Sequence, residues 1–144
     1  MKQSRNFDWI QKNTAEMVDL WMYNFVRNSH DFLNGKSLKK LSIFKNKSVK
    51  PKKSTNSAIV IGAGPSIRNN KHLELLAKSN YKGAIVCTDR MLIPCLKNGI
   101  TPKKFPKFYV LTIEPKDVTL AFYNNPIVKK FHKGIHAVLS TCTE

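Results

Sequence analysis

The sequence predicts an α/β fold, a Rossmann-like parallel sheet that follows an N-terminal helical extension. Short apolar runs alternate with amphipathic segments over the second half of the chain, which is the pattern of parallel strands joined by crossover helices. A glycine-rich turn directly follows the first of these runs. The length of 144 residues has room for one domain of this kind.

Residues 1–35 are predicted to form the N-terminal helical segment. Apolar residues recur at helical spacing over residues 7–33. Asn13, with Glu16 three residues later, resembles a capping box that would start the main helix, and Gly35 tolerates the left-handed conformation that ends helices. Because the apolar residues cover more than one face, we expect this helix to pack on two sides.

Residues 36–57 form a predicted basic connector. The stretch 32–73 holds ten basic residues and no acid, and it supplies most of the net charge of +16. This charge indicates an anionic partner, either nucleic acid, nucleotide phosphate or anionic lipid, although a lysine-rich solvated surface explains it equally well. Nucleic acid is not favoured, because the lysines lack the interleaved aromatic residues on which bases stack.

Residues 58–144 form the predicted Rossmann-like domain. The apolar runs are continuous and rich in β-branched residues, which is typical of strands buried on both faces. We expect the domain to continue beyond Glu144, because a doubly wound sheet usually extends past four strands. We expect these 144 residues alone to be poorly soluble or to self-associate, because the edge of the sheet would be unprotected. The expected strands are 58–62, 84–88, 108–113 and 137–140, and the expected helices are 69–79, 90–98 and 118–122.

The cysteines indicate the cellular compartment in which the protein works. Cys87, Cys95 and Cys142 form no CxxC pair and lie in apolar surroundings, so we interpret them as reduced thiols. The N-terminus lacks a signal-peptide pattern. No apolar run approaches the ~20 residues needed to cross a bilayer. Together these features predict a cytoplasmic protein without a transmembrane segment.

The turn after the first strand is the first candidate site. It consists of Gly62, Ala63, Gly64, Pro65 and Ser66, where glycine lets the backbone approach a phosphate and the next helix directs its N–H groups at an anion. It lacks the third glycine of the dinucleotide fingerprint and the Gly-Lys-Ser/Thr of a Walker A loop. The alternative is a tight turn without a ligand, in which Ser66 caps the helix.

Acidic residues follow the next two strands. Asp89 and Glu114 would meet at the carboxyl edge of a parallel sheet, where they could bind ribose hydroxyls or hold Mg²⁺ against phosphate oxygens. The structural alternatives are a helix N-cap at Asp89 and another at Asp117. The hydroxyls of Ser140, Thr141 and Thr143 would add to the same rim.

Four motifs in this order resemble the MptE-like 6-hydroxymethylpterin diphosphokinase family, which also contains the motility-associated Maf glycosyltransferases. They are AIVIGAGPSI from Ala58, AIVCTDRML from Ala84, KNGITP from Lys97 and VLTIEP from Val110, and the similarity covers roughly residues 58–143. The resemblance implies transfer of pyrophosphate from ATP to 6-hydroxymethyl-dihydropterin with Mg²⁺. The Maf branch implies the alternative, transfer of a sugar from a nucleotide-activated donor to a protein or glycan. A third hypothesis is a non-enzymatic, basic nucleic-acid-binding module.

The resemblance also implies roles for single residues. The loop 62–66 would hold the donor phosphates, with Arg90 or nearby lysines neutralising charge. Asp89 would bind Mg²⁺ or ribose, and Glu114 would hold the metal or orient the acceptor hydroxyl, so both are predicted to be catalytic. Two positions depart from the family pattern: Lys103 stands where the family usually has aspartate, and Glu114 replaces an aspartate.

Overall fold

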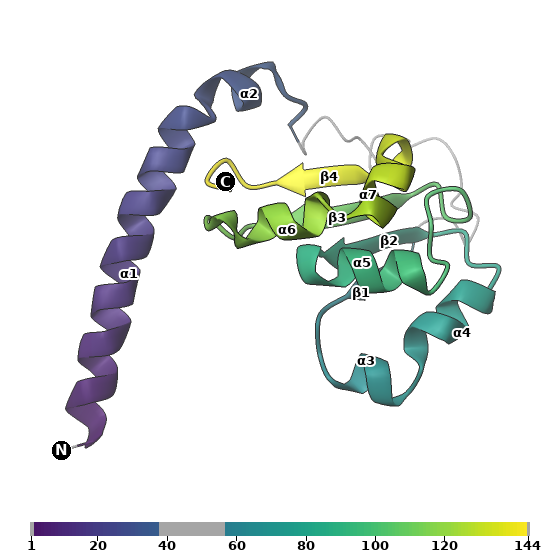
Figure 1. Ribbon diagram of the computed structural model, residues 1–144, viewed down its shortest axis with the longest axis horizontal. Coiled ribbons are helices and arrows are strands. Elements are labelled where there is room, and N and C mark those ends of the chain that lie inside the picture. The colour runs from purple at the N-terminus through teal and green to yellow at the C-terminus, as the bar shows by residue number, and fades with distance from the viewer. Residues whose placement is uncertain (1, 38–56, 144) are drawn as a thin grey trace.

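A four-stranded parallel sheet forms the centre of the structure, a computed structural model that describes residues 2–37 and 57–143, with side chains from residue 12 onward (Figure 1). The strands lie in chain order, β1-β2-β3-β4. Strands alternate with helices, so the predicted α/β, Rossmann-like class is confirmed. The basic connector lies outside the described residues except at its ends. The strands are β1 (Ala58–Ile61), β2 (Ala84–Thr88), β3 (Phe108–Thr112) and β4 (His136–Leu139).

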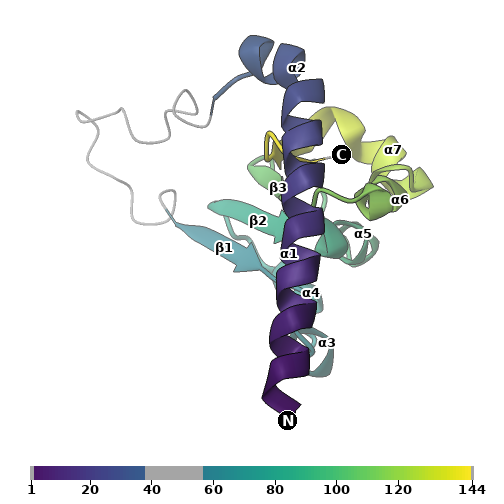
Figure 2. The ribbon, with the colours of Figure 1, turned by 90° about the vertical axis from the view of Figure 1, so that its left-hand side faces the viewer.

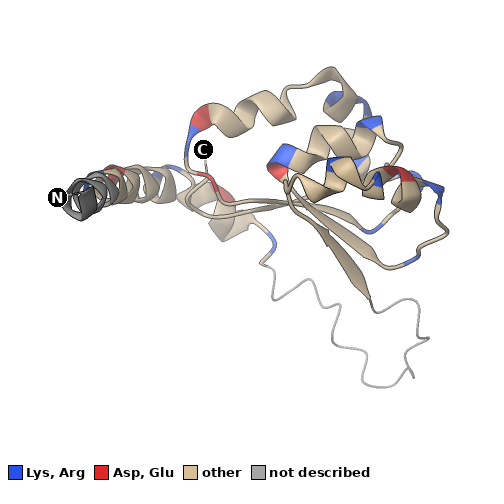
Figure 3. Cartoon of the chain, turned by 90° about the horizontal axis from the view of Figure 1, so that it is seen from below, with Lys and Arg blue, Asp and Glu red and all other residues tan. Residues whose placement is uncertain are grey.

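The helices that follow β1 all lie on one face of the sheet (Figure 3). Each new strand is added on the same side of the previous one, and right-handed crossovers then place every connecting helix on the same face. These elements are α3 (Ser66–Asn69), α4 (His72–Lys78), α5 (Asp89–Lys97), η2 (Asp117–Thr119), α6 (Leu120–Tyr123), α7 (Pro126–Phe131) and η3 (His132–Gly134).

The two faces of the sheet are buried to different extents. On the helix-covered face Ile85, Phe108 and Val110 are fully buried and pack in the core with Leu92 of α5. The opposite face exposes apolar side chains, including Val60 at 77%. The prediction that the strands are buried on both faces is therefore wrong within the described residues, because no described helix covers the second face.

The glycine turn is followed by two short helices instead of one. The predicted helix 69–79 begins earlier, at Ser66, and is interrupted at Lys71, whose φ of 52° is left-handed. Pro65 occupies the N-cap of α3, and no side chain caps this helix, so the alternative in which Ser66 is the cap does not hold. The earlier start follows from proline, whose fixed φ suits the first turn of a helix.

Two of the predicted caps after the later strands are also wrong. The N-cap of α5 is Thr88, and Asp89 is its first residue. Asp117 begins η2 without a side-chain cap bond. The predicted end of α5 is confirmed, because Gly99 has a φ of 85°, which L residues rarely adopt. The sequence analysis missed α7, where the Asn125 side chain accepts a hydrogen bond from the Ile127 backbone N–H.

The N-terminal segment forms α1 (Lys2–Arg27) and α2 (Ser29–Asn34). The predicted start at Asn13 is wrong, because residues 2–12 contain neither Pro nor Gly to interrupt the helix. Gly35 does follow the last helical residue, although its φ of −74° is not left-handed. No described helix is long and apolar enough to span a membrane.

Helix α1 crosses the carboxyl edge of the sheet near β3 and β4 (Figures 1 and 2). Asn24 is fully buried, and its Nδ2 donates to the backbone oxygens of Pro115 at 2.8 Å and Cys142 at 3.1 Å. One turn later, Asn28 Nδ2 donates to the backbone oxygen of Thr143 at 2.6 Å. The described part of α1 packs on one side only, so the expected two-sided packing does not occur among the residues that the structure describes.

Candidate functional site

The loop between β1 and α3 is exposed and leaves open space above its glycines. A Cβ added to Gly62 would meet nothing within 4 Å, and one added to Gly64 would meet only Ser66 Oγ at 3.8 Å. Neither glycine has a positive φ. Their lack of a side chain is therefore required neither by the backbone conformation nor by packing within the described chain. The space that a Cβ would fill is available to a ligand.

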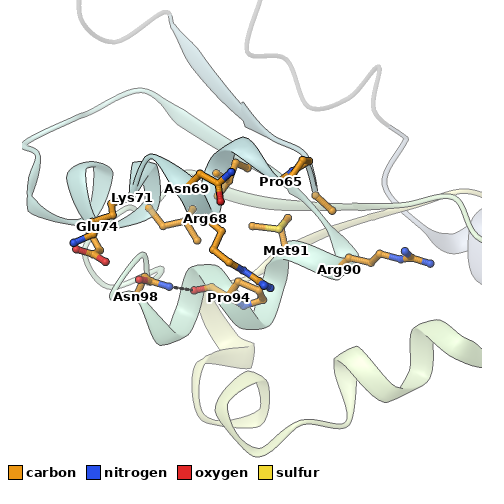
Figure 4. Close-up of a pocket in the computed structure, with 13 residues that line it drawn as sticks. Pro65, Arg68, Asn69, Lys71, Glu74, Arg90, Met91, Pro94 and Asn98 are labelled. Atoms are coloured by element: carbon orange, nitrogen blue, oxygen red, sulfur yellow. Dashed lines mark hydrogen bonds between the residues drawn. The ribbon is translucent and has the colours of Figure 1, made fainter.

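A pocket of about 610 Å³ lies beside this loop, between α3–α4 and α5 (Figure 4). That volume is in the usual range for small-molecule sites. The loop contributes Ala63, Gly64 and Pro65. The other lining residues are Ile67, Arg68, Asn69, Lys71, Leu73, Glu74, Arg90, Met91, Pro94 and Asn98.

The pocket is cationic. Arg68, Lys71 and Arg90 line it together with a single acid, Glu74. No ion pair involving these three cations occurs within the described part of the chain. Figure 4 shows Arg68 extending from α3 toward Pro94 of α5, whereas the end of Arg90 points away from the other labelled residues. An anionic group bound in the pocket could therefore pair with Arg68.

Arg68 and Lys71 were missed by the sequence analysis. The expected helix began at residue 69, which left Arg68 in the turn and gave it no orientation. Because α3 begins at Ser66, Arg68 lies in the first turn after the loop, and the left-handed Lys71 brings the chain back toward the pocket. The Pro-Ser pair after the second glycine was the signal that could have indicated this earlier start.

Asp89 lies at the carboxyl end of β2, at the start of the helix that forms one wall of the pocket. Its Oδ1 accepts a hydrogen bond from the Arg90 backbone N–H at 2.6 Å. A carboxylate in the first turn also interacts favourably with the positive end of the helix dipole. Its second oxygen has no hydrogen bond from any described residue. Asp89 itself does not line the pocket.

Tyr123 of α6 lies near Asp89. Its hydroxyl lies 2.7 Å from Thr112 Oγ1 at the end of β3. Burial raises the pKa of Tyr123, the hydrogen bond with Thr112 lowers it, and the negative charge of Asp89 raises it further. The phenol therefore stays protonated at neutral pH. Thr88 Oγ1, on the residue before Asp89, is buried without a hydrogen-bond partner within the described chain.

The buried thiols belong to the core. Cys87 and Cys95 are free and almost fully buried. Its hydrogen bond with Cys95, followed by burial and then by the negative charges of Cys95 and Asp89, raises the pKa of Cys87 far above its usual range. A neutral thiol of this kind is a poor nucleophile.

Glu114 lies two residues beyond the end of β3. Its Oε1 accepts a hydrogen bond from the Lys116 backbone N–H at 3.3 Å, and the following residue, Pro115, is held by Asn24. Glu114 does not line the pocket. Strands β2 and β3 are neighbours, so Asp89 and Glu114 do share the carboxyl edge. The described residues include no cluster of three or more His, Cys, Asp or Glu side chains that could hold a metal ion.

Two of the predicted rim hydroxyls, and Lys103, lie outside the site. Thr143 is buried, with its hydroxyl bonded to the Thr112 backbone oxygen, and Ser140 Oγ accepts from the Cys142 backbone N–H. These hydroxyls stabilise the turn after β4 and do not form a rim. Lys103 lies in the turn before β3, at the amino edge of the sheet, so its departure from the family pattern does not affect the carboxyl edge.

One comparison with known proteins gave a match. A family model described as 6-hydroxymethylpterin diphosphokinase MptE-like matches residues 23–143. This range includes the last turn of α1, all four strands and every residue of the pocket. No curated protein and no solved structure matched the chain.

Proposed function

The chain belongs to the MptE-like 6-hydroxymethylpterin diphosphokinase family, and from this membership we propose that it transfers pyrophosphate from ATP to 6-hydroxymethyl-dihydropterin. The family name indicates a transferase. The proposal adds the donor, the acceptor and the residues that would bind them. We also propose that the enzyme works in the cytoplasm.

The observation that carries the proposal is the cationic pocket beside the open glycines. The polyphosphate of ATP would lie over Gly62 and Gly64, with Arg68 and Lys71 neutralising its charge. Arginine suits this role because its planar guanidinium donates two parallel hydrogen bonds to phosphate oxygens. The end of Arg90 points toward the carboxyl edge, where the reacting phosphate would lie.

The acceptor would bind along the carboxyl edge. The acceptor's hydroxymethyl oxygen forms a bond to the β-phosphorus of ATP, the bond between that phosphorus and the oxygen bridging to the α-phosphorus breaks, and AMP leaves. The hydroxyl proton passes to a carboxylate, for which the free oxygen of Asp89 is the first candidate. Glu114 would orient the acceptor. Such catalysis depends mainly on positioning and charge neutralisation.

The carboxylates of Asp89 and Glu114 suit a cation that binds together with the nucleotide. Mg²⁺ in proteins is usually bound by one or two carboxylates together with substrate phosphates, and Asp89 and Glu114 are two carboxylates on neighbouring strands. We propose that these residues would hold it. The ion would neutralise phosphate charge in the transition state.

The same pocket suits a second candidate function, that of a Maf-type glycosyltransferase. The diphosphate of a nucleotide-activated sugar has the same charge and hydrogen-bonding needs as that of ATP, so the open glycines and Arg68 would bind it equally. Asp89 would then bind ribose hydroxyls, and the sugar would pass to a protein or glycan acceptor.

A product assay tests the proposal. The purified chain would be incubated with ATP, Mg²⁺ and 6-hydroxymethyl-dihydropterin, and pterin diphosphate and AMP would be measured by chromatography. We expect equal amounts of both products, and none from Asp89→Asn. Binding of nucleotide sugars without ATP turnover would favour the glycosyltransferase. Nucleic-acid binding that survives Asp89→Asn, with no nucleotide bound, would favour the basic binding module.

A further inference from the structure

The pocket beside the glycine loop has two chemically different ends. Figure 4 shows Pro65 and Arg90 at one end and Glu74 and Asn98 at the other, with the end of Arg68 between them. Glu74 is the only acid among the described residues that line the pocket. A carboxylate repels a phosphate group, so a bound nucleotide would direct its phosphates to the loop and its base toward Glu74 and Asn98.

Apolar side chains line the pocket between its two ends. Leu73 of α4 and Met91 of α5 are buried in the core except for the surface that lines the pocket, and Ile67 and Pro94 line it as well. The two helices therefore present apolar surfaces to the same space. A flat aromatic ring suits such a space, and a methionine sulfur makes favourable contacts with the edge of one.

The side chain of Asn98, directly after α5, has a defined orientation. Its Nδ2 donates a hydrogen bond to the Pro94 backbone oxygen at 2.8 Å. Because a carbonyl oxygen only accepts hydrogen bonds, the amide nitrogen must face Pro94 and Oδ1 must face away from it. Oδ1 accepts no hydrogen bond from a described residue. The end of the pocket away from the loop therefore contains a positioned hydrogen-bond acceptor.

Glu74 adds a second acceptor from the opposite wall. It lies in the first turn of α4 and forms no hydrogen bond or ion pair with any described residue, Lys71 included. A carboxylate accepts hydrogen bonds and cannot donate them. A ligand at this end of the pocket would therefore meet two acceptors, one from each wall.

We propose that Asn98 and Glu74 bind an exocyclic amino group of the donor's base, such as the C6 amino group of adenine, and so determine the base specificity. This inference rests on the proposed function, in which the same pocket binds the donor nucleotide. The amino group has two N–H donors, one for Asn98 Oδ1 and one for the Glu74 carboxylate. A keto group at the same position would place an oxygen against both acceptors and leave them unpaired, which weakens binding.

Isothermal titration calorimetry with ATP and inosine triphosphate (ITP) tests this specificity, because ITP has a keto group in place of the C6 amino group. We expect the wild type to bind ATP about tenfold more tightly than ITP. Asn98→Ala should bind ATP more weakly and ITP as before. Glu74→Gln should bind ITP more tightly, because the new amide can donate to the keto oxygen.

Asn34→Ala is the matched control. Asn34 is exposed, as Asn98 is, and its Nδ2 also donates to the backbone oxygen four residues earlier, that of His30 at 2.9 Å, but it lies outside the pocket. This control should keep the wild-type ratio of ATP to ITP affinity. The ratio separates recognition from folding, because a variant that only loses stability binds both nucleotides more weakly.

Equal binding of ATP and ITP by the wild type would overturn this inference and leave the proposed phosphate site standing. Asn98→Ala and Glu74→Gln variants that both keep the wild-type ratio would overturn it as well. A wild type that binds neither nucleotide would refute the donor pocket itself, and this inference with it.

Discussion

At the scale of single residues, Arg68 has the most direct role in the proposed site. It extends into the pocket from the first turn after the glycine loop and has no ion-pair partner among the described residues. A cation left unpaired beside an open loop gains most from binding an anion. Its contribution to nucleotide binding should therefore exceed its contribution to folding.

Arg68→Gln should weaken ATP binding by about 10- to 100-fold, because a hydrogen bond to a charged group contributes about 1.5–3 kcal/mol. Lys78→Gln removes an exposed cation from the same helical region but outside the pocket, and should leave the affinity unchanged. Isothermal titration calorimetry on both variants measures the difference. Equal losses in both would mean that only net charge matters.

Tyr123 predicts a pH effect on stability. Its pKa is raised in the folded state, so the unfolded chain loses the phenolic proton first as pH rises. The stability contributed by the protonated phenol is complete below about pH 10 and declines above it. Urea unfolding of the wild type and Tyr123→Phe should show a free-energy difference that shrinks above about pH 10. A constant difference would show that Tyr123 titrates normally.

At the scale of elements, α1 holds the carboxyl edge together. The Asn24 amide binds the backbone after β3 and after β4 at once, so one side chain fixes two loops that are far apart in sequence. Glu114 lies in the loop after β3, directly before Pro115. The N-terminal segment is therefore part of the structure that supports the proposed acceptor site.

Asn24→Ala should lower the free energy of unfolding by about 1–3 kcal/mol, because it leaves two backbone oxygens without their donor. Asn34→Ala is the control. Asn34 also donates to a backbone oxygen, that of His30, but it is exposed, so its loss should change stability little. Urea unfolding followed by circular dichroism measures both. A variant as stable as the wild type would indicate that water replaces the Asn24 amide.

The elements also show how far the sequence determines the fold. The strands were predictable because runs such as Ala84–Thr88 are continuous and β-branched. The helix boundaries were less predictable. Asn13 has a side chain that can cap a helix, but capping competes with continuation, and no preceding residue stops α1. The role of Asn24 could not be predicted, since its partners lie 91 and 118 residues away.

The candidate site was also predicted only in part, because local sequence patterns determine some of its residues and distant contacts determine the others. The loop 62–66 follows from local sequence, and the structure does form a pocket beside it. The position of Tyr123 near Asp89 depends on how α6 packs onto the sheet, which no local sequence pattern predicts. The position of Glu114 depends on the path of the chain after β3, and α1 packs against that segment.

At the scale of the whole molecule, the site extends along the carboxyl edge. The loop lies after β1, Asp89 after β2 and Glu114 after β3, so three successive strands deliver their ends to one side of the sheet. The donor pocket is at the β1 end, and α1 packs near β3 and β4. This arrangement supports the assignment of donor and acceptor to different parts of one edge.

The proposed Mg²⁺ should lie between the donor and acceptor parts of the carboxyl edge. We expect ATP affinity to fall when Mg²⁺ is removed, and Asp89→Asn to abolish most of this Mg²⁺ dependence. Glu114→Gln should have a smaller effect, because the longer Glu114 side chain tolerates displacement of its end. Calorimetric titrations with Mg²⁺ and with EDTA test this. Metal-independent binding by the wild type would contradict the shared cation and favour a ribose role for Asp89.

The central claim is that the glycine loop binds a nucleotide phosphate, and Gly64→Val tests it most directly. The new side chain would point into open space, since the nearest atom to an added Cβ is Ser66 Oγ at 3.8 Å, and the backbone φ is not positive. The fold should therefore remain intact, as a thermal melt would show. Ala137→Val, which also introduces a valine side chain but at an exposed residue of β4, is the control. Calorimetry with ATP should show binding by the wild type and the control, and at least a tenfold loss in Gly64→Val. A folded Gly64→Val variant that binds ATP as tightly as the wild type would contradict the claim.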